Sequence, residues 1–335
     1  MSFRKALVTG CCGFIGSHMT RLLVNSGWYV EGVDDLSNGD LSSLEDLDFR
    51  TVPAPLVHMF DFDKSTPEPQ SGGLLVVTSD FAAPEILSRV ASGKYDVIFH
   101  FAANPRVEYS VQHPALTTHE NVQKTVELMT AGIKNIDRFV FASSSSCYGN
   151  AKELPTTESC ESNPESPYGL QKLVVEQFGK MYNQLYGMEF AALRFFNVYG
   201  PGQDGTSPYS TAISAWCTRL KKGEPLRSDG DGTQTRDMVY VGDVASAMKS
   251  AADYKEDLGF QVFNVGNGEA FQNKEILEYL VSKFPDAEIN HAPERAGDVK
   301  RTLGSIEKTS NMLGWKPQVQ FWDGLNKTLS WWDLL

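Results

Sequence analysis

Short apolar runs alternate with longer stretches of mixed polarity through the first part of the chain. The runs are rich in valine, leucine, isoleucine and phenylalanine, whereas the longer stretches repeat their apolar residues at helical spacing. Strands that alternate with helices in this way form a parallel sheet through crossover connections. The pattern predicts strands at residues 6–9, 29–33, 74–77, 96–100, 139–143 and 190–194, with helices at about 15–26, 121–133 and 168–186.

Two parts of the chain depart from this alternation. Residues 50–73 contain four prolines and a Gly-Gly pair, which predicts an irregular excursion from the sheet. After Phe195, clusters of glycine, proline, aspartate and threonine separate shorter helices, as expected of a smaller domain whose loops shape a pocket. We therefore expect an α/β fold, a Rossmann-type doubly wound parallel sheet with a smaller α/β substrate-binding cap. The sheet domain would comprise residues 1–194 and about 233–266, and the cap would comprise about 195–232 and 267–335.

The composition is that of an ordinary globular protein, and its 335 residues supply a core for roughly two domains. The net charge of -12 argues against nucleic acid and anionic membranes as partners, because both would repel the chain, but it permits a local basic pocket for a phosphate. The five cysteines are an odd number without framework spacing, so we expect reduced thiols and a cytoplasmic protein. We expect no signal peptide and no membrane-spanning segment.

A glycine triplet, Gly10-x-x-Gly13-x-x-Gly16, follows the first predicted strand and opens the first predicted helix. The first glycine permits a tight turn, the second lets the backbone approach a pyrophosphate, and the third lets helix and strand pack closely. The N–H groups of the helix N-terminus then bind the pyrophosphate. The motif, with Phe14 and Ile15 inside it, therefore predicts a dinucleotide-binding site; the alternative is a glycine-rich turn without a ligand.

Asp34, at the end of the second predicted strand, is the expected partner of the adenosine ribose. A carboxylate accepts hydrogen bonds from the ribose hydroxyls and repels a 2′-phosphate, and no arginine follows at once, so the sequence favours NAD over NADP. Asp34 or Asp35 can instead cap a turn. Cys11 and Cys12 lie side by side in the glycine loop, where we expect their small size to matter more than their sulfur. We expect no metal site.

Tyr168 and Lys172 lie one helical turn apart and share a helix face. A phenol with a pKa near about 10 is a poor base, and a nearby ammonium favours the phenolate. Tyr168 can then exchange a proton with a sugar hydroxyl while hydride moves between that carbon and a nicotinamide. Ser144, at the end of the fifth predicted strand, can hydrogen-bond the reacting oxygen. A lone Tyr-x-x-x-Lys pattern usually indicates surface packing, and it is the glycine triplet that favours catalysis here.

These motifs, in this order, resemble those of the extended short-chain dehydrogenase/reductase family, and within it the nucleotide-sugar 4-epimerases. The resemblance runs nearly end to end. It rests on the glycine triplet, on Tyr168-x-x-x-Lys172, on Asn121, and on the stretches 34–38, 80–81, 100–103, 144–149, 194–201, 236–244 and 295–299.

The resemblance implies roles for further residues at the cofactor. Asp80 and Phe81 would contact the adenine, Asn38 would help to hold the adenosine, and Lys172 would also bind the nicotinamide ribose. Ala102 and Asn121 lie in the matching cofactor motifs.

The resemblance also implies a set of substrate residues. An acidic protein that binds a diphosphate needs local arginines, and Arg236 and Arg295 are candidates, with surface ion pairing as the alternative. The implied set is Asn197, Arg236, Arg295 and Asp298 for the nucleotide diphosphate, and Ser144 and Ser145 for the sugar.

The turn Ser144–Gly149 helps to distinguish the reactions that share this scaffold. The related 4,6-dehydratases resemble Ser-Thr-Asp-Glu-Val-Tyr-Gly here, and the decarboxylases of UDP-glucuronate carry a glutamate, whereas this chain has no acid in the turn. The sequence therefore favours reversible 4-epimerisation of a UDP-sugar through a 4-keto intermediate with tightly bound NAD. Cys147 lies one residue away from the position of the proton-transferring cysteine in GDP-sugar 3,5-epimerases, and we expect it to be a small buried residue.

The sugar and the assembly are less closely defined. By resemblance, Thr302 occupies a position at which a bulky tyrosine would exclude an N-acetyl group. The smaller threonine leaves room for that group, which favours UDP-GlcNAc and UDP-GalNAc. UDP-glucose and UDP-galactose stay open, as do uronic acids through Lys300 or Arg301. The remaining alternatives are a UDP-glucuronate 4-epimerase, a decarboxylase, a 4,6-dehydratase and a non-catalytic NAD-sensing relative. A homodimer through the helices at 121–133 and 168–186 is expected.

Overall fold

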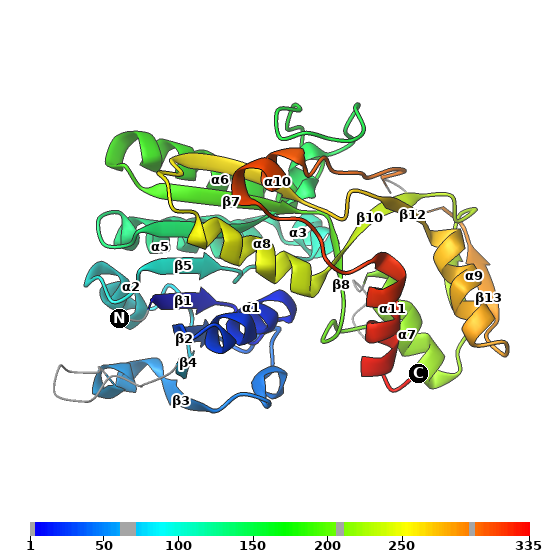
Figure 1. The fold of residues 1–335 in the computed structure, drawn as a ribbon, viewed down its shortest axis with the longest axis horizontal. Coiled ribbons are helices and arrows are strands. Elements are labelled where there is room, and N and C mark those ends of the chain that lie inside the picture. Colours follow the sequence, from blue (N-terminus) through cyan, green and yellow to red (C-terminus); the bar gives the residue numbers. More distant parts are fainter. Residues whose placement is uncertain (1–3, 61–71, 206–210, 295–298) are drawn as a thin grey trace. The chain divides into compact units, whose positions relative to one another are not determined.

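The structure, a computed structural model, describes residues 4–60, 72–205, 211–294 and 299–335 and divides them between two compact units (Figure 1). Unit 1 comprises Met1–Cys147, Pro164–Arg194 and Ala245–Phe263. Unit 2 comprises Tyr148–Asn163, Phe195–Val244 and Asn264–Leu335.

Unit 1 is built on an eight-stranded sheet whose central strands pair in parallel. The central strands are almost fully buried, since helices cover parallel sheets on both faces, and this burial explains their continuous apolar runs. In spatial order the strands are β11 (Phe260–Val265), β7 (Glu189–Phe195), β6 (Arg138–Ser144), β5 (Val97–His100), β1 (Lys5–Thr9), β2 (Tyr29–Asp34), β4 (Leu74–Thr78) and β3 (Phe49–Pro53).

The parallel register brings chemically important segments to one edge of this sheet. Because β1 pairs in parallel with β2 and β5, and β5 with β6, these strands all end on the same side. The residues that follow them, beginning with Gly10, Asp34 and Ser144, therefore share the carboxyl edge, where ligands bind in open α/β sheets.

Helices connect the strands of unit 1, and the expected helices and strands are present to within a few residues. The expected helix at 121–133 begins as a π-helical turn, and its α-helical part starts only at Lys124. The helices are α1 (Phe14–Asn25), α2 (Pro84–Ala91), α3 (Val107–Gln112), α4 (Pro114–Thr118), η3 (His119–Gln123), α5 (Lys124–Gly132), α6 (Pro167–Tyr186) and α8 (Val241–Asp253), the last of which begins in unit 2.

The expectation of an irregular excursion at residues 50–73 is wrong for its first part. Phe49–Pro53 is the edge strand β3, which pairs in parallel with β4, and Ala54–Phe60 is a 3-10 helix. An edge strand tolerates proline because one side of it makes no ladder hydrogen bonds, so Pro53 does not disrupt the sheet. Residues 61–71 lie outside the described residues.

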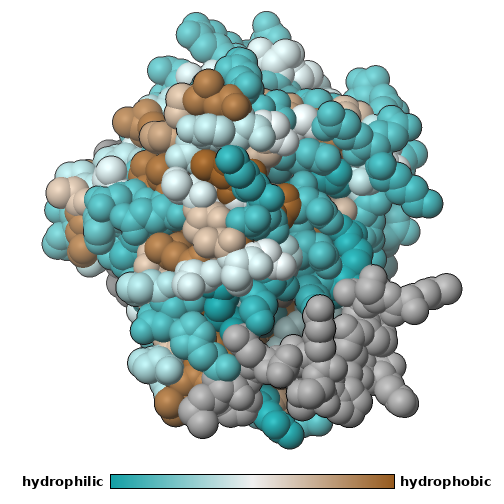
Figure 2. Space-filling view, turned by 90° about the vertical axis from the view of Figure 1, so that its left-hand side faces the viewer, coloured by the Kyte–Doolittle hydropathy of each residue, from teal (hydrophilic) through white to brown (hydrophobic). Residues whose placement is uncertain are grey.

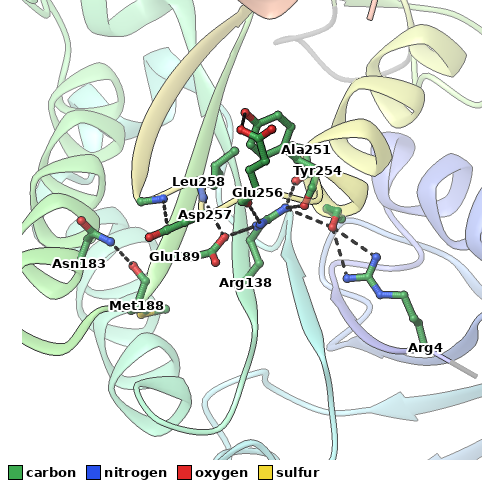
Figure 3. A network of polar contacts seen from close by, with 12 residues as sticks. Arg4, Arg138, Asn183, Met188, Glu189, Ala251, Tyr254, Glu256, Asp257 and Leu258 are labelled. Carbon is green, nitrogen blue, oxygen red and sulfur yellow. Dashed lines mark hydrogen bonds and ion pairs between the residues drawn. The ribbon is translucent and has the colours of Figure 1, made fainter. Parts of the chain in front are cut away.

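Arg138, at the start of β6, anchors the carboxyl end of α8 (Figure 3). Its guanidinium donates hydrogen bonds to the carbonyls of Ala251 at 2.6 Å and Tyr254 at 3.0 Å, and it is paired with Glu189. Arg4 donates more weakly to the nearby Ala252 carbonyl, at 3.3 Å. A cation at a helix carboxyl terminus satisfies carbonyls that lack helical partners, so this contact fixes the end of α8 against the start of β6.

Unit 2 has a core of its own around Tyr199, Trp216 and Phe321. One small sheet consists of β12 (Ala270–Gln272), β10 (Thr235–Tyr240) and β8 (Asn197–Tyr199), and another of β13 (Ile289–Ala292) and β9 (Leu226–Asp229). The helices are α7 (Ala212–Lys222), α9 (Asn273–Lys283), α10 (Glu307–Leu313) and α11 (Phe321–Trp331).

The two units differ in detail from the expected division of the chain. Residues 148–163 and 233–244 pack with unit 2, although the sequence assigned them to the sheet domain. The reason is local: β10 pairs with β8 and β12 and so completes the smaller unit's sheet. The functional division into an NAD-binding and a nucleotide-sugar-binding domain stays a prediction.

One face of the molecule is mostly hydrophilic, with hydrophobic side chains gathered in several separate groups (Figure 2). No helix in the described part of the chain has both the length and the apolar character needed to cross a membrane.

Candidate functional site

The glycine triplet forms a tight cradle between β1 and α1. Gly10 has a φ of +71°, and a Cβ at Gly16 would lie 1.9 Å from the Gly10 carbonyl oxygen, so the third glycine is required for helix and strand to approach. Helix α1 begins at Phe14, directly after Gly13, and no side chain caps its first turn. Its first N–H groups are therefore available to an anion, and the cradle fits the pyrophosphate of a dinucleotide.

Asp34 closes one side of this cradle. Its carboxylate accepts hydrogen bonds from the backbone N–H groups of Cys12 and Leu36, both at 2.9 Å, and is 7% exposed. Burial raises the pKa of Asp34, and the two N–H donors oppose this effect. Each oxygen keeps lone-pair capacity, so the carboxylate can also accept hydroxyl protons from a ribose. Asn38 lies on the exposed loop that follows.

The other predicted cofactor residues lie after β4 and β5 and on the helix that follows. Asp80 accepts a 2.6 Å hydrogen bond from Lys124, and the Phe81 ring packs edge-on against His100 in the core. Ala102 donates its N–H to Thr9 beside the cradle. Asn121 is 2% exposed, and its side chain both accepts from and donates to the backbone of Asn104. Asn121 therefore holds the loop after β5 in place.

The three predicted catalytic residues lie near the carboxyl end of β6. Tyr168 and Lys172 lie on the first turns of α6, whose amino terminus is capped by Ser166. Ser144 lies beside the Tyr168 phenol, and its hydroxyl also donates a 3.1 Å hydrogen bond to Ser146. The Lys172 ammonium lies 5.7 Å from the centre of the Tyr168 ring and donates to the carbonyl of Ala142 at 2.8 Å.

Burial controls the proton affinities of this group. Burial lowers the pKa of Lys172 to about 8 and raises the pKa of Tyr168 above its ordinary range, while the neighbouring Ser144 hydroxyl acts in the opposite direction on the phenol. The chain alone therefore holds Tyr168 protonated at neutral pH. Any further positive charge near the phenol would ease the release of its proton.

A buried ion pair supports the turn behind the catalytic group. Glu176 lies one helical turn after Lys172 and is bound by Arg194 through two hydrogen bonds of 2.9 and 2.6 Å. The same carboxylate accepts a 2.5 Å hydrogen bond from Ser143. Cys147 is fully buried beside this pair, and burial raises its pKa to about 12, so its thiol stays protonated.

Unit 2 contains a basic cavity of about 540 Å³. Its wall includes four basic side chains against two acidic ones, although the chain as a whole has a net charge of -12. The charged residues are Arg219 and Lys222 from α7, Glu224 after it, Arg227 and Asp229 from β9, and Arg236 from β10; Asn197, Trp216 and Asn273 also line the cavity.

Several residues of this cavity were not found from the sequence, and their positions explain why. Arg219 and Arg227 belong to no motif, and only the local excess of basic residues between 219 and 227 distinguishes them. Of the predicted substrate residues, Asn197 and Arg236 line the cavity, and Thr302 donates a 3.4 Å hydrogen bond to Asn197.

The structure places one further predicted substrate residue, Ser145, away from this cavity. Ser145 follows Ser144 in the turn after β6, in unit 1. Arg295 and Asp298 lie outside the described residues.

Unit 1 thus offers a dinucleotide cradle and a phenol that can exchange a proton, and unit 2 offers a cationic cavity suited to a phosphorylated ligand. Residues 6–266 match the NAD dependent epimerase/dehydratase family. The chain is 34% identical over 334 residues to the UDP-glucose 4-epimerase of Mycolicibacterium smegmatis, with 97% of each chain covered.

Two solved structures are similar over nearly the whole chain. The UDP-glucose 4-epimerase of Thermotoga maritima with UDP-glucose has a TM-score of 0.84 and 30% identity, with 98% of each chain covered. The UDP-N-acetylglucosamine 4-epimerase of Methanobrevibacter ruminantium in complex with UDP-N-acetylmuramic acid has a TM-score of 0.86 and 29% identity, with 99% of each chain covered.

Proposed function

The chain belongs to the NAD-dependent epimerase/dehydratase family, and on that basis we propose that it interconverts the C4 epimers of a UDP-sugar with tightly bound NAD. The observation that carries the proposal is the grouping of Ser144, Tyr168 and Lys172 at the carboxyl end of β6. NAD, bound in the cradle, supplies a hydride acceptor and donor and a positive charge.

The chain's own residues handle the proton. Ser144 hydrogen-bonds the C4 oxygen of the sugar, and Tyr168 takes the proton of that hydroxyl and later returns it. Lys172, one turn along α6, lowers the energy of the phenolate through its charge. The sugar, now a 4-ketone, turns about its diphosphate anchor. Its C4 is then reduced on the opposite face.

The acid-free turn favours epimerisation over elimination or decarboxylation. Loss of water or carbon dioxide from the ketone requires a proton donor or acceptor beside it, and Ser144–Gly149 contains no carboxylate. Glu176, which packs behind the turn, is 1% exposed and is held by Arg194. Its carboxylate therefore has no route to a substrate carbon.

The cavity of unit 2 would hold the nucleotide diphosphate. Arginine binds phosphate oxygens through paired N–H donors, and Arg219, Arg227 and Arg236 all line this cavity. Asn197 adds an amide at the same wall. The UDP-glucose of the Thermotoga maritima enzyme is the corresponding ligand class.

For the sugar we favour an N-acetylhexosamine. Thr302 is small, and its hydroxyl is held in place because it accepts the Asp237 N–H at 3.2 Å and donates to Asn197. The similar Methanobrevibacter ruminantium enzyme is named for UDP-N-acetylglucosamine. A threonine at this point leaves space that a tyrosine would fill.

We also propose a homodimer in the cytoplasm. Apolar side chains on α3, α4 and α6 are strongly exposed, including Val111 at 60% and Leu185 at 63%. An apolar groove between α4, α5 and α6 includes Val122 and Phe178. A second copy would cover these helices, and the five free thiols suit a reducing compartment.

The test is to incubate the purified protein with UDP-GlcNAc, UDP-glucose or UDP-glucuronate, without added cofactor, and to follow the sugars by NMR. We expect reversible conversion of UDP-GlcNAc to UDP-GalNAc. Tyr168→Phe should lower turnover at least about 100-fold while NAD stays bound. Tyr186→Phe, an exposed tyrosine on the same helix, is the matched control and should retain full activity.

Two results would contradict the proposal. An irreversible loss of mass corresponding to water or carbon dioxide would assign the chain to the dehydratases or decarboxylases. Equal turnover of the Tyr168→Phe variant and the unmodified chain would remove the phenol from the reaction. Binding of NAD without conversion of any of the three UDP-sugars would favour the non-catalytic NAD-sensing alternative.

A further inference from the structure

Two adjacent cysteines lie buried in the loop between β1 and α1. Cys11 is 0% exposed and Cys12 is 2% exposed, and their sulfur atoms are 3.7 Å apart. The Asp34 carboxylate lies beside them, so that the two sulfurs and one carboxylate oxygen are all within 4.8 Å of one another. These are three potential metal ligands at one point of the cradle.

The surrounding backbone holds the two sulfurs in place. A Cβ at Gly32 would lie only 2.6 Å from the Cys11 sulfur, so this sulfur packs directly on the backbone of β2. The Cys12 carbonyl accepts a 3.0 Å hydrogen bond from Ser43, which fixes the other residue of the pair. The thiol pair is therefore preorganised, and little side-chain entropy is lost when it binds an ion.

The geometry fits a tetrahedral thiolate site. Zinc–sulfur bonds of about 2.3 Å place two sulfur ligands about 3.8 Å apart on the edge of a tetrahedron, close to the observed separation. The Asp34 oxygen would need to approach the sulfurs by up to about 1.3 Å to reach a third vertex. Two sulfur ligands select zinc and cadmium over magnesium and calcium, which prefer oxygen.

We propose that Cys11, Cys12 and Asp34 form an inhibitory site for a thiophilic divalent cation of the zinc class, and that this ion and NAD exclude each other. The exclusion rests on the proposed role of Asp34 at the NAD ribose, because one carboxylate would serve both ligands. Binding releases two thiol protons and forms two metal–sulfur bonds. Two thiolates and one carboxylate leave a charge of -1 around the dication.

The test is titration of the full chain with Cd²⁺, followed through the ultraviolet charge-transfer absorption of cadmium–thiolate bonds. Freed of NAD, the protein should bind one ion per chain at this site, and an excess of Zn²⁺ should displace it. Cys11→Ala and Cys12→Ala should each weaken binding by about 100-fold. Cys160→Ala is the matched control, because this half-buried thiol lies outside the cradle and its removal should leave the titration unchanged.

The outcomes separate the site from the proposed function. Saturation with NAD should abolish the absorption band, and Cd²⁺ should in turn slow NAD rebinding. Binding that persists in both cradle variants, with their fold verified by circular dichroism, overturns the site. Binding that needs both cysteines but continues with NAD bound overturns the exclusion. Epimerase activity of the NAD-loaded protein, measured without metal, tests the proposed function independently of either result.

Discussion

Replacing Arg194 by methionine removes one half of the most deeply buried ion pair near the catalytic group. Arg194 and Glu176 have exposed side-chain fractions of 5% and 1%, and two hydrogen bonds join them. Methionine is unbranched and uncharged, and it is shorter than arginine. In the variant, the Glu176 carboxylate would keep the Ser143 hydroxyl as a donor but lose its counter-ion.

The expected loss of stability is about 3–5 kcal/mol, because an uncompensated carboxylate remains in a dry interior. The unfolding equilibrium should therefore shift by two to four orders of magnitude. Removing both charges together should be much less harmful, since the desolvation cost of both ions disappears with their attraction. We expect the double variant Glu176→Gln/Arg194→Met to recover most of the loss.

Urea unfolding followed by tryptophan fluorescence measures these differences. The control is Arg4→Met, which breaks the partly exposed pair with Asp253 and should cost less than about 1 kcal/mol. The reasoning would be refuted if Arg194→Met cost no more than this control. It would equally be refuted if the double variant were as unstable as the sum of its two single changes.

Three further changes test other parts of the structure. Burial raises the pKa of Asp237 to about 6, so the folded chain binds this proton more tightly than the unfolded chain does. The stability gained from the protonated group is full at low pH and is lost as the pH rises from about 4 to 6. Asp237→Asn should remove up to about 3 kcal/mol of this decline, as measured by urea unfolding across that pH range. Gly16→Ala forces a Cβ into a carbonyl oxygen, and the purified variant should have lost its NAD, as measured by absorbance. Gly187→Ala is the control, because a Cβ there meets open space. It should lower the stability by about 1 kcal/mol and retain NAD. Arg138→Met should lower stability by about 2–4 kcal/mol because several α8 carbonyls lose a charged donor (Figure 3), and a loss no larger than that of Arg4→Met would contradict this account.

The sheet and its cradle could be predicted because their signals are local. A buried parallel strand is a continuous apolar run, and the steric demands of Gly10 and Gly16 arise within one strand–turn–helix unit. Tyr168 and Lys172 share a helix face by spacing alone. The edge strand at 49–53 was missed because Val52 is its one buried residue and proline ends it, so that it lacks the continuous apolar signal of its neighbours.

The basic cavity of unit 2 shows the opposite case. Arg219, Arg227 and Arg236 come from a helix and two strands that meet only through the packing of the smaller core. Their separation along the chain carries no information about their distance in space. Likewise, Asn121 contacts the backbone of Asn104 and the side chain of Gln171, and its distance from them along the sequence gives no sign of either contact.

By itself, the sequence determined the α/β class, the dinucleotide motif and the spacing of the phenol and the ammonium, because short-range sterics and helical periodicity govern all three. Only the tertiary structure decided which cations surround the cavity, how burial moves the proton affinities of Lys172 and Tyr168, and that two sulfurs and a carboxylate lie within reach of one ion. These properties depend on desolvation and on contacts between distant segments, which arise only when the chain is packed.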